Sequence, residues 1–217
     1  MPESLRPTWE ALHNEVVAVH SRWIIYRQLF AESEERVKIL NECAAHFFSV
    51  IQATLLYDVQ LTLSKLADPA STNGKANATL ALLVKEIDAL KEQPLTDQLN
   101  DLLTKYRASC KQIKTRRNKQ IAHFDHATLL QQYGTGPADL PGPSRQEIED
   151  ALAALRCFME PVEVYLTSCP TAYQAVHSIS DGEALISVLQ EGLRYQDLQK
   201  DGVIAWDDRR KSSRFGS

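Results

Sequence analysis

Several patterns that identify common protein classes are missing from this 217-residue sequence. The cysteines form no Cys-x-x-Cys pair and have no histidines at zinc-binding spacing; they are Cys43, Cys110, Cys157 and Cys169. A zinc finger or a redox pair is therefore not indicated. We expect free thiols in a reducing compartment and no metal.

Targeting and membrane segments are also missing. The opening residues, Met1-Pro2-Glu3-Ser4, show no basic region followed by an apolar one. No apolar run approaches about 20 residues, the length of a membrane-spanning helix. We therefore expect a cytoplasmic protein without a signal peptide or a membrane span.

Glycine-rich phosphate loops are absent as well. Gly74-Lys75 lacks the spacing of a P-loop, and Gly134-Thr135-Gly136 follows no strand pattern. The sequence therefore predicts no nucleotide fingerprint and no cofactor.

Positive charge is scarce overall and concentrated in one place. The chain has 24 Lys and Arg against 28 Asp and Glu, a net charge of −4, which excludes a generic polycation for nucleic acid. Residues 105–119 nevertheless contain seven Lys or Arg and no Asp or Glu. Any nucleic-acid site must therefore be a local patch on this basic segment.

Apolar residues recur at helical spacing along most of the chain. Helices are expected over residues 8–30, 33–67, 77–93, from 96 through the basic segment, and from 144 to about 166. The second would span about 50 Å if unbroken, so we expect it either to bend or to form a long element of the bundle. Asn77 is the expected cap of the third helix, and Ser144 with Glu147 forms a capping box. Residues 68–77 and 133–143 are expected as polar loops.

This pattern predicts an all-α bundle of about five main helices over residues 8–168. Residues 171–217 are expected to form a helical appendage that packs on the bundle or on a partner subunit. Trp9 and Trp23 follow the apolar stripe of the first helix. We expect them to be core anchors, with base stacking as the alternative.

The basic segment ends in a cluster of chemically active side chains, Arg116-Arg117-Asn118-Lys119-Gln120-Ile121-Ala122-His123-Phe124-Asp125. An arginine binds phosphate with a rigid fork of donors, and a histidine transfers protons near neutral pH. Together they predict phosphodiester chemistry or phosphate binding.

Arg117-Asn118-x-x-x-Ala122-His123 resembles the Arg-(polar)-x(4–6)-His signature of HEPN domains, which are helical domains of prokaryotic defence systems. Two further stretches resemble the abortive-infection AbiU-like branch. They are Tyr57-Asp58-x-x-Leu61-x-Leu63-Ser64-Lys65-Leu66-x-Asp68-Pro69 and Ala122-His123-x-Asp125. The resemblance covers residues 8–168. It implies an HEPN-like bundle that cleaves or binds RNA in a toxin or phage-defence setting, with an antitoxin as a further class of partner.

Arg117 and His123 are six residues apart, which places them about 240° apart around an ideal helix. Side by side on one straight helix, they cannot share a small substrate. Either the helix deforms between them, or a second subunit completes the site. The resemblance favours the second alternative, because HEPN ribonucleases are generally dimers whose two motifs meet in a cleft.

The first functional hypothesis is a metal-independent endoribonuclease. Cleavage beside a 2′-hydroxyl needs a proton acceptor, a cation for the phosphorane charge and a proton donor for the leaving oxygen. His123 is the candidate acid and base and Arg117 the phosphate clamp, while Asn118 hydrogen-bonds the phosphate or holds a partner side chain.

Neighbouring side chains are expected to assist this chemistry. The residues expected to bind substrate through their charge are Arg116, Lys119 and Lys114. The supporting residues are Asp58 and Tyr57, on a neighbouring helix, and Asp125. Asp58 is either a surface carboxylate or orients Arg117. Asp125 either tunes His123 or pairs with an arginine.

Two other interpretations remain open. In the first, the chain is a non-catalytic helical module for interaction or dimerisation, in which Arg117, Asn118 and Asp125 form a structural network. In the second, His123, Asp125 and His126 bind a metal, although no further ligand is tied to them by spacing. No serine or cysteine stands out as a nucleophile.

Overall fold

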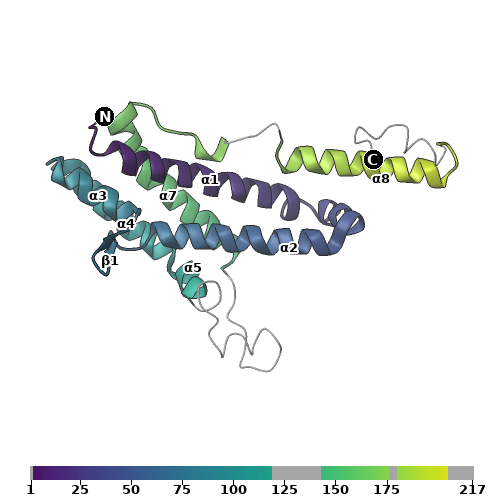
Figure 1. Cartoon of the computed structure of the whole chain (residues 1–217), viewed down its shortest axis with the longest axis horizontal. Coiled ribbons are helices and arrows are strands. Elements are labelled where there is room, and N and C mark those ends of the chain that lie inside the picture. Colours follow the sequence, from purple (N-terminus) through teal and green to yellow (C-terminus); the bar gives the residue numbers. More distant parts are fainter. Residues whose placement is uncertain (1, 119–142, 176–179, 205–217) are drawn as a thin grey trace, which may run out of the picture. The chain divides into compact units, whose positions relative to one another are not determined.

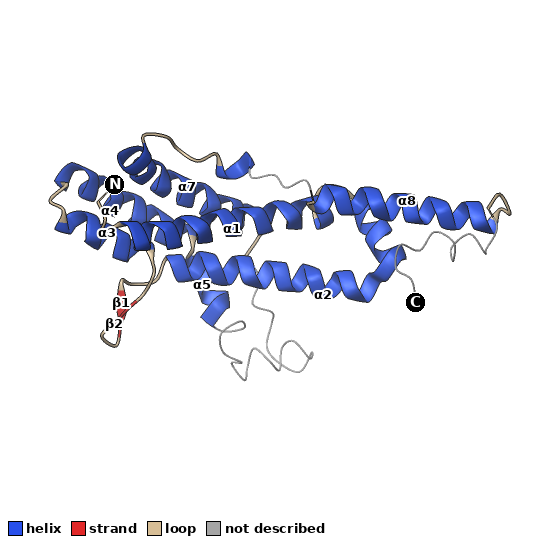
Figure 2. Cartoon of the chain, turned by 45° about the horizontal axis from the view of Figure 1, so that its top comes forward, coloured by secondary structure: helices blue, strands red, loops and turns tan. Residues whose placement is uncertain are grey.

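The computed structural model describes residues 2–118, 143–175 and 180–204, and almost all of its regular structure is helical (Figures 1 and 2). The elements are α1 (Arg6–Phe30), α2 (Glu34–Leu66), β1 (Ser71–Thr72), β2 (Lys75–Ala76), α3 (Leu80–Ala89), α4 (Gln93–Ser109), α5 (Lys111–Arg116), α7 (Arg145–Thr167), the 3-10 helix η2 (Tyr173–Ala175) and α8 (Gly182–Lys200). The all-α prediction is confirmed.

The chain divides into two compact units. The first comprises Met1–Trp23 and Thr54–Val176, and the second comprises Ile24–Ala53 and His177–Ser217. Because α1 and α2 run through both units, this division differs from the sequence-based one at residues 168 and 171, which stays a prediction.

The first unit is a helical bundle in which α4 packs along α7 and α3 packs along α4. A polar contact links α1 to α7: Trp23 Nε1 donates a hydrogen bond to Glu149 over 2.9 Å. Trp9 and Trp23 are both buried, so they are core residues as expected. Buried apolar side chains from α1, the end of α2, α3, α4 and α7 meet in this core.

The expected loop at 68–77 contains a short hairpin, drawn beside the end of α2 in Figure 1. Asn73 and Gly74 both have positive φ, 50° and 78°, as the Asn-Gly turn between two short strands requires. The expectation that Asn77 caps α3 is wrong. Its amide nitrogen donates to Pro69 O and Thr72 Oγ1 at the base of the hairpin. The cap of α3 is Thr79, whose hydroxyl accepts from Leu82 N.

Three other local expectations can be compared with the structure. α2 is interrupted at Ala44, where φ is −166° and ψ is 69°, so it bends, which is one of the two alternatives expected from its length. The helix expected from residue 96 instead begins at Gln93 and breaks at Cys110, which separates α4 from α5. The capping box of Ser144 and Glu147 is present at the start of α7.

The second unit packs the end of α1 and the first half of α2 against α8. Its small apolar core consists of Leu29, Leu40, Phe48 and Ile186. Polar contacts reinforce it. Gln28 bridges to the start of α8, because its Nε2 donates to Asp181 Oδ2 over 2.8 Å and its Oε1 accepts from Gly182 N over 3.0 Å. Arg36 donates to both carboxylate oxygens of Glu183.

Replacing Gly182 with alanine should destabilise the second unit. A Cβ there would lie 2.9 Å from Gln28 Cβ and 2.9 Å from Gln28 Oε1, so α8 would have to move away from α1. We expect Gly182→Ala to lower the free energy of unfolding by about 1–3 kcal/mol. Gly192→Ala is the matched control in the same helix, where a Cβ meets nothing within 4 Å. It should raise stability by about 0.5–1 kcal/mol. Amide hydrogen exchange in α8 reports the effect, and equal protection in both variants would contradict it.

Candidate nucleic-acid interface

Arg117 is held by a carboxylate that follows the end of α2. Its Nη2 lies 3.0 Å from Asp68 Oδ1 and 3.1 Å from Asp68 Oδ2. Lys114 Nζ reaches the same carboxylate, at 2.8 Å from Oδ1. The arginine side chain is only 17% exposed, so this charge is partly desolvated. One carboxylate therefore serves two cations of the basic segment.

Asp58, which sequence reasoning offered as a partner of Arg117, lies elsewhere. Its Oδ2 is 3.1 Å from Arg22 Nε on α1. Asp58 and Asp68 are ten residues apart, which corresponds to about 15 Å along an ideal helix and about 280° around it. They therefore face different neighbours, and the carboxylate that contacts Arg117 is Asp68. Tyr57 is 41% exposed and contributes no contact to the Asp68 cluster among the described residues.

The position of Asp68 depends on the hydrogen bonds that α4 makes to the end of α2. Tyr106 Oη donates to Leu63 O over 2.6 Å, and Arg107 Nε donates to Ala67 O over 3.1 Å. Leu63 lies in the last turn of α2 and Ala67 directly follows the helix, where helical partners run out and the helix dipole favours a cation. Burial raises the pKa of Tyr106 well above its ordinary value, so the hydroxyl stays protonated and donates. Adjacent residues of α4 thus fix the segment that carries Asp68.

A shallow cavity of about 470 Å³ lies along the basic segment and is lined by Arg107, Ala108, Lys111, Lys114, Thr115 and Asn118. Arg107 and Ala108 belong to α4, and Lys111, Lys114 and Thr115 belong to α5, so the cavity runs along two consecutive helices. The described lining residues include three cations and no carboxylate. Lys114 and Asn118, two predicted site residues, belong to this basic groove, defined here by those six residues.

The other predicted residues are not gathered there. Arg116 is half-buried, and its Nε has no hydrogen-bond partner within the described part of the chain. Lys119, His123, Asp125 and His126 lie outside the described residues, so their roles remain predictions. Within residues 2–118, 143–175 and 180–204, no group of three or more His, Cys, Asp or Glu is placed to hold a metal ion.

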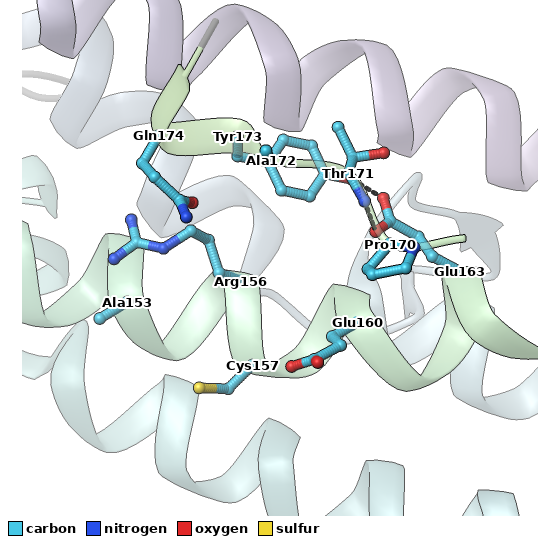
Figure 3. A pocket seen from close by; sticks show the side chains of 10 residues that line it. All are labelled: Ala153, Arg156, Cys157, Glu160, Glu163, Pro170, Thr171, Ala172, Tyr173 and Gln174. Atoms are coloured by element: carbon cyan, nitrogen blue, oxygen red, sulfur yellow. Dashed lines mark hydrogen bonds between the residues drawn. The ribbon is translucent and has the colours of Figure 1, made fainter. Parts of the chain in front are cut away.

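A second polar cluster lies between α7 and the segment 170–174, beside a cavity of about 410 Å³ (Figure 3). Glu163 is buried and accepts hydrogen bonds from Tyr173 Oη and, over 2.6 Å, from Thr171 N. His13 Nδ1 on α1 lies 3.0 Å from Tyr173 Oη. Burial, together with the bond to Glu163, raises the pKa of Tyr173, so its hydroxyl remains a donor. Since both carboxylate oxygens are occupied, this cluster ties the segment to the bundle.

Sequence reasoning missed this cluster. Glu163 lies in the expected fifth helix and Tyr173 in the expected appendage, and no local pattern links either to His13, which lies about 150 residues earlier in the chain. The available signal was weak: a glutamate on the apolar side of an amphipathic helix needs a buried partner.

His20, the next neighbour of this cluster, is buried and neutral. Its Nδ1 donates to Val16 O over 2.8 Å, which leaves Nε2 to accept from Arg156 Nη1 at 3.3 Å. Its ring stacks on Tyr173 with centroids 5.2 Å apart. Burial, and to a smaller extent the Arg156 charge, lowers the pKa of His20 from 6.5 to about 4.

Acidification should therefore weaken the first unit through His20. Between about pH 6.5 and pH 4 the unfolded chain binds a proton at this residue and the folded chain does not, so stability falls as the pH falls. From pH 7.5 to pH 5 we expect this residue to cost about 2 kcal/mol of unfolding free energy. Denaturant titrations of wild type and His20→Gln measure the difference.

The variant should show a flatter dependence on pH than wild type. His46→Gln, which alters an exposed histidine of α2, is the control and should keep the wild-type dependence. Identical slopes for wild type and His20→Gln would contradict the assignment.

The sequence model of the HEPN AbiU2 family, described as AbiU2, matches residues 3–185. No curated protein and no solved structure matches the chain. The matched span includes Asp68, the basic groove and the whole Arg117–His123 motif. The chain therefore belongs to the AbiU2 family of HEPN domains, as its sequence motifs predicted.

Proposed function

We propose that this abortive-infection HEPN protein is a metal-independent endoribonuclease of single-stranded RNA, acting as a homodimer. The observation that carries the proposal is Arg117, held in one orientation by Asp68 next to a groove whose charged lining is entirely cationic.

The groove suits a phosphate backbone rather than a single anion. Its lining extends from Arg107 in α4, across the break at Cys110, to Asn118 after α5, so the cations are spread along the chain rather than gathered around one anion. Arg107 keeps its full charge because its partners are carbonyls. Lys111 is exposed and has no ion-pair partner among the residues the structure describes. Because the chain as a whole is acidic, this local field directs RNA to one face.

The chemistry follows from the residue types. A base removes the 2′-hydroxyl proton, and the 2′-oxygen attacks phosphorus while Arg117 stabilises the charge on the phosphorane oxygens. The 5′-oxygen leaves and takes a proton from the acid, which gives a cyclic phosphate and a 5′-hydroxyl. His123 serves as acid and base, and Asn118, exposed at the end of the groove, binds a phosphate oxygen.

A second copy supplies the missing half of each site, since a spacing of six residues corresponds to about 240° on an ideal helix. α2 offers a surface for it. From Cys43 to Tyr57 this helix carries no Asp, Glu, Lys or Arg, and Phe47 is 58% exposed. Of the described helices, α2 is the one whose length and composition would allow it to cross a membrane, and 11% of its apolar window is buried. The core helix of a soluble protein and a signal sequence pass the same test. We assign the face to a partner copy because the motif requires one.

Arg117→Ala and His123→Ala should each abolish RNA cleavage in EDTA. Each variant removes one of the groups that cannot be replaced, so we expect losses of at least about 100-fold in kcat/KM. The measurement is cleavage of end-labelled single-stranded RNA. Growth and total RNA are followed in a bacterial host that expresses each variant.

Arg194→Ala is the control, because this exposed arginine of α8 has no ion-pair partner among the described residues. It should cleave as wild type does. Cleavage by the motif variants at the wild-type rate would contradict the nuclease assignment. It would favour the alternative, a non-catalytic module that binds a partner and cuts nothing.

Phe47→Asp should convert the dimer to a monomer. A charge on the apolar face of α2 would be buried without a partner at a two-fold contact, which association cannot tolerate. Light scattering on purified protein measures the mass. Glu42→Gln changes an exposed residue of the same helix and should leave the dimer intact. A wild-type protein that is monomeric, and that floats with lipid vesicles through Phe47, would assign this face to a membrane instead.

A further inference from the structure

Asp68 has two effects on Arg117, and they act in opposite directions on RNA. It fixes the guanidinium in space, and it neutralises part of the charge that RNA has to meet. Both effects follow from the contacts of one carboxylate with Arg117 and Lys114.

The fixing effect is geometric. Both oxygens of Asp68 accept from a single nitrogen of Arg117, Nη2. The other N–H groups of the guanidinium therefore do not bind Asp68. Arg117 Nε is buried and has no hydrogen-bond partner in the part of the chain that the structure describes. Asp68 is itself immobilised. Its backbone N–H donates to Lys65 O over 3.0 Å, and Arg107 holds the preceding carbonyl at Ala67. The arginine therefore has a defined direction before any phosphate arrives.

The neutralising effect is electrostatic. Arg117 and Lys114 carry two positive charges and Asp68 carries one negative charge, so the cluster has a net charge of +1. The Asp68 side chain is only 22% exposed and that of Arg117 is 17% exposed, so solvent screens this pairing less than it screens a surface pair. A phosphate that binds Arg117 also has to approach the Asp68 carboxylate, and the two anions repel each other.

We propose that Asp68 is a positioning residue that increases turnover at Arg117 and at the same time weakens the binding of RNA. This rests on the proposed function, because it assigns a role in RNA cleavage. An enzyme gains turnover when it binds its substrate weakly but stabilises the transition state strongly. Asp68 serves both conditions, because it weakens the binding of RNA and orients the cation that stabilises the transition state. A purely structural ion pair would instead affect binding and turnover together, through folding.

Asp68→Asn separates the two effects, because asparagine keeps an acceptor oxygen and the shape but removes the charge. We expect RNA affinity at low salt to rise about fivefold, since roughly one opposing charge is removed. The slope of log Kd against log salt should steepen by about 0.7, the value for one more phosphate contact on a single strand. We expect kcat to fall by about 10- to 100-fold, because the guanidinium loses half of its support.

Asp88→Asn is the matched control. It makes the same change in net charge at an exposed position of α3 with no ion-pair partner among the described residues, so affinity and kcat should stay at wild-type values. Circular dichroism and thermal melting establish that each variant is folded.

Lys114→Gln provides a second, independent arm with the opposite sign. The substitution removes one positive charge beside Asp68, so RNA affinity should fall. Asp68 still pairs with Arg117 and keeps it in place, so kcat should change less than threefold. This arm also tests the proposal if Asp68→Asn fails to fold.

The outcomes are distinct. Weaker binding by folded Asp68→Asn, or an affinity of Lys114→Gln equal to that of wild type, would overturn the positioning role and leave the nuclease proposal standing. Wild-type protein that binds RNA without cutting it would overturn the nuclease proposal and with it the turnover half, whereas the effect of Asp68→Asn on binding would still be measured. If wild type neither binds nor cuts RNA, and Arg117→Ala behaves identically, then the proposed function itself fails.

Discussion

The contact between the end of α2 and the basic segment is the interaction on which this architecture depends. A helix end exposes carbonyl groups that have no helical partner, and they must be satisfied from outside. Here the hydroxyl of Tyr106 and the guanidinium of Arg107 satisfy them, so the same contact that completes α2 also aligns α4 with it. Asp68 follows immediately, and Pro69 prevents the helix from continuing. The carboxylate therefore projects at a fixed height toward Lys114 and Arg117.

This arrangement makes the candidate site a product of packing rather than of the motif alone. Tyr106 is fully buried in the core of the first unit, and Arg107, next to it, faces the groove. A change in the core at Tyr106 would shift the segment that carries Asp68, and with it the direction of Arg117. The core and the phosphate site are thus coupled through two adjacent residues of α4.

The part of the fold that depends on local pattern could be predicted from sequence. Helical periodicity gave the main helices, and Ser144 with Glu147 marked the start of α7 because a capping box is a local device. The hairpin after α2 also had a local signal, Asn73-Gly74, but its strands are two residues long and carry no alternating pattern. The sequence predicted Asn77 as a helix cap because residues 68–77 were expected to form a loop without a hairpin. In the structure, Asn77 instead bonds Pro69 and Thr72 across the hairpin.

The contacts that define the site were harder to predict, since they join distant parts of the chain. Two aspartates stand near the end of α2, and periodicity alone does not say which one meets the arginine. That choice depends on the rotation of α2 against α4, which the contacts of Tyr106 and Arg107 set. The cluster of His13, Glu163 and Tyr173 depends in the same way on three segments meeting. The family could be recognised because the motif that contains Arg117 and Asn118 is short and continuous, and the roles of these two residues stay predictions.

The second unit combines residues inside the family match with residues beyond it. The match ends at residue 185, and α8 continues to Lys200. Its attachment uses few apolar side chains, and polar contacts from Gln28 and Arg36 supply much of the specificity. Polar contacts depend strongly on direction, so they fix one position of α8 against α1 and α2. A small apolar core alone would allow several such positions. Within the second unit, α8 can therefore pack on the end of α1 with only a small apolar core, provided that one glycine, Gly182, allows the close approach to Gln28.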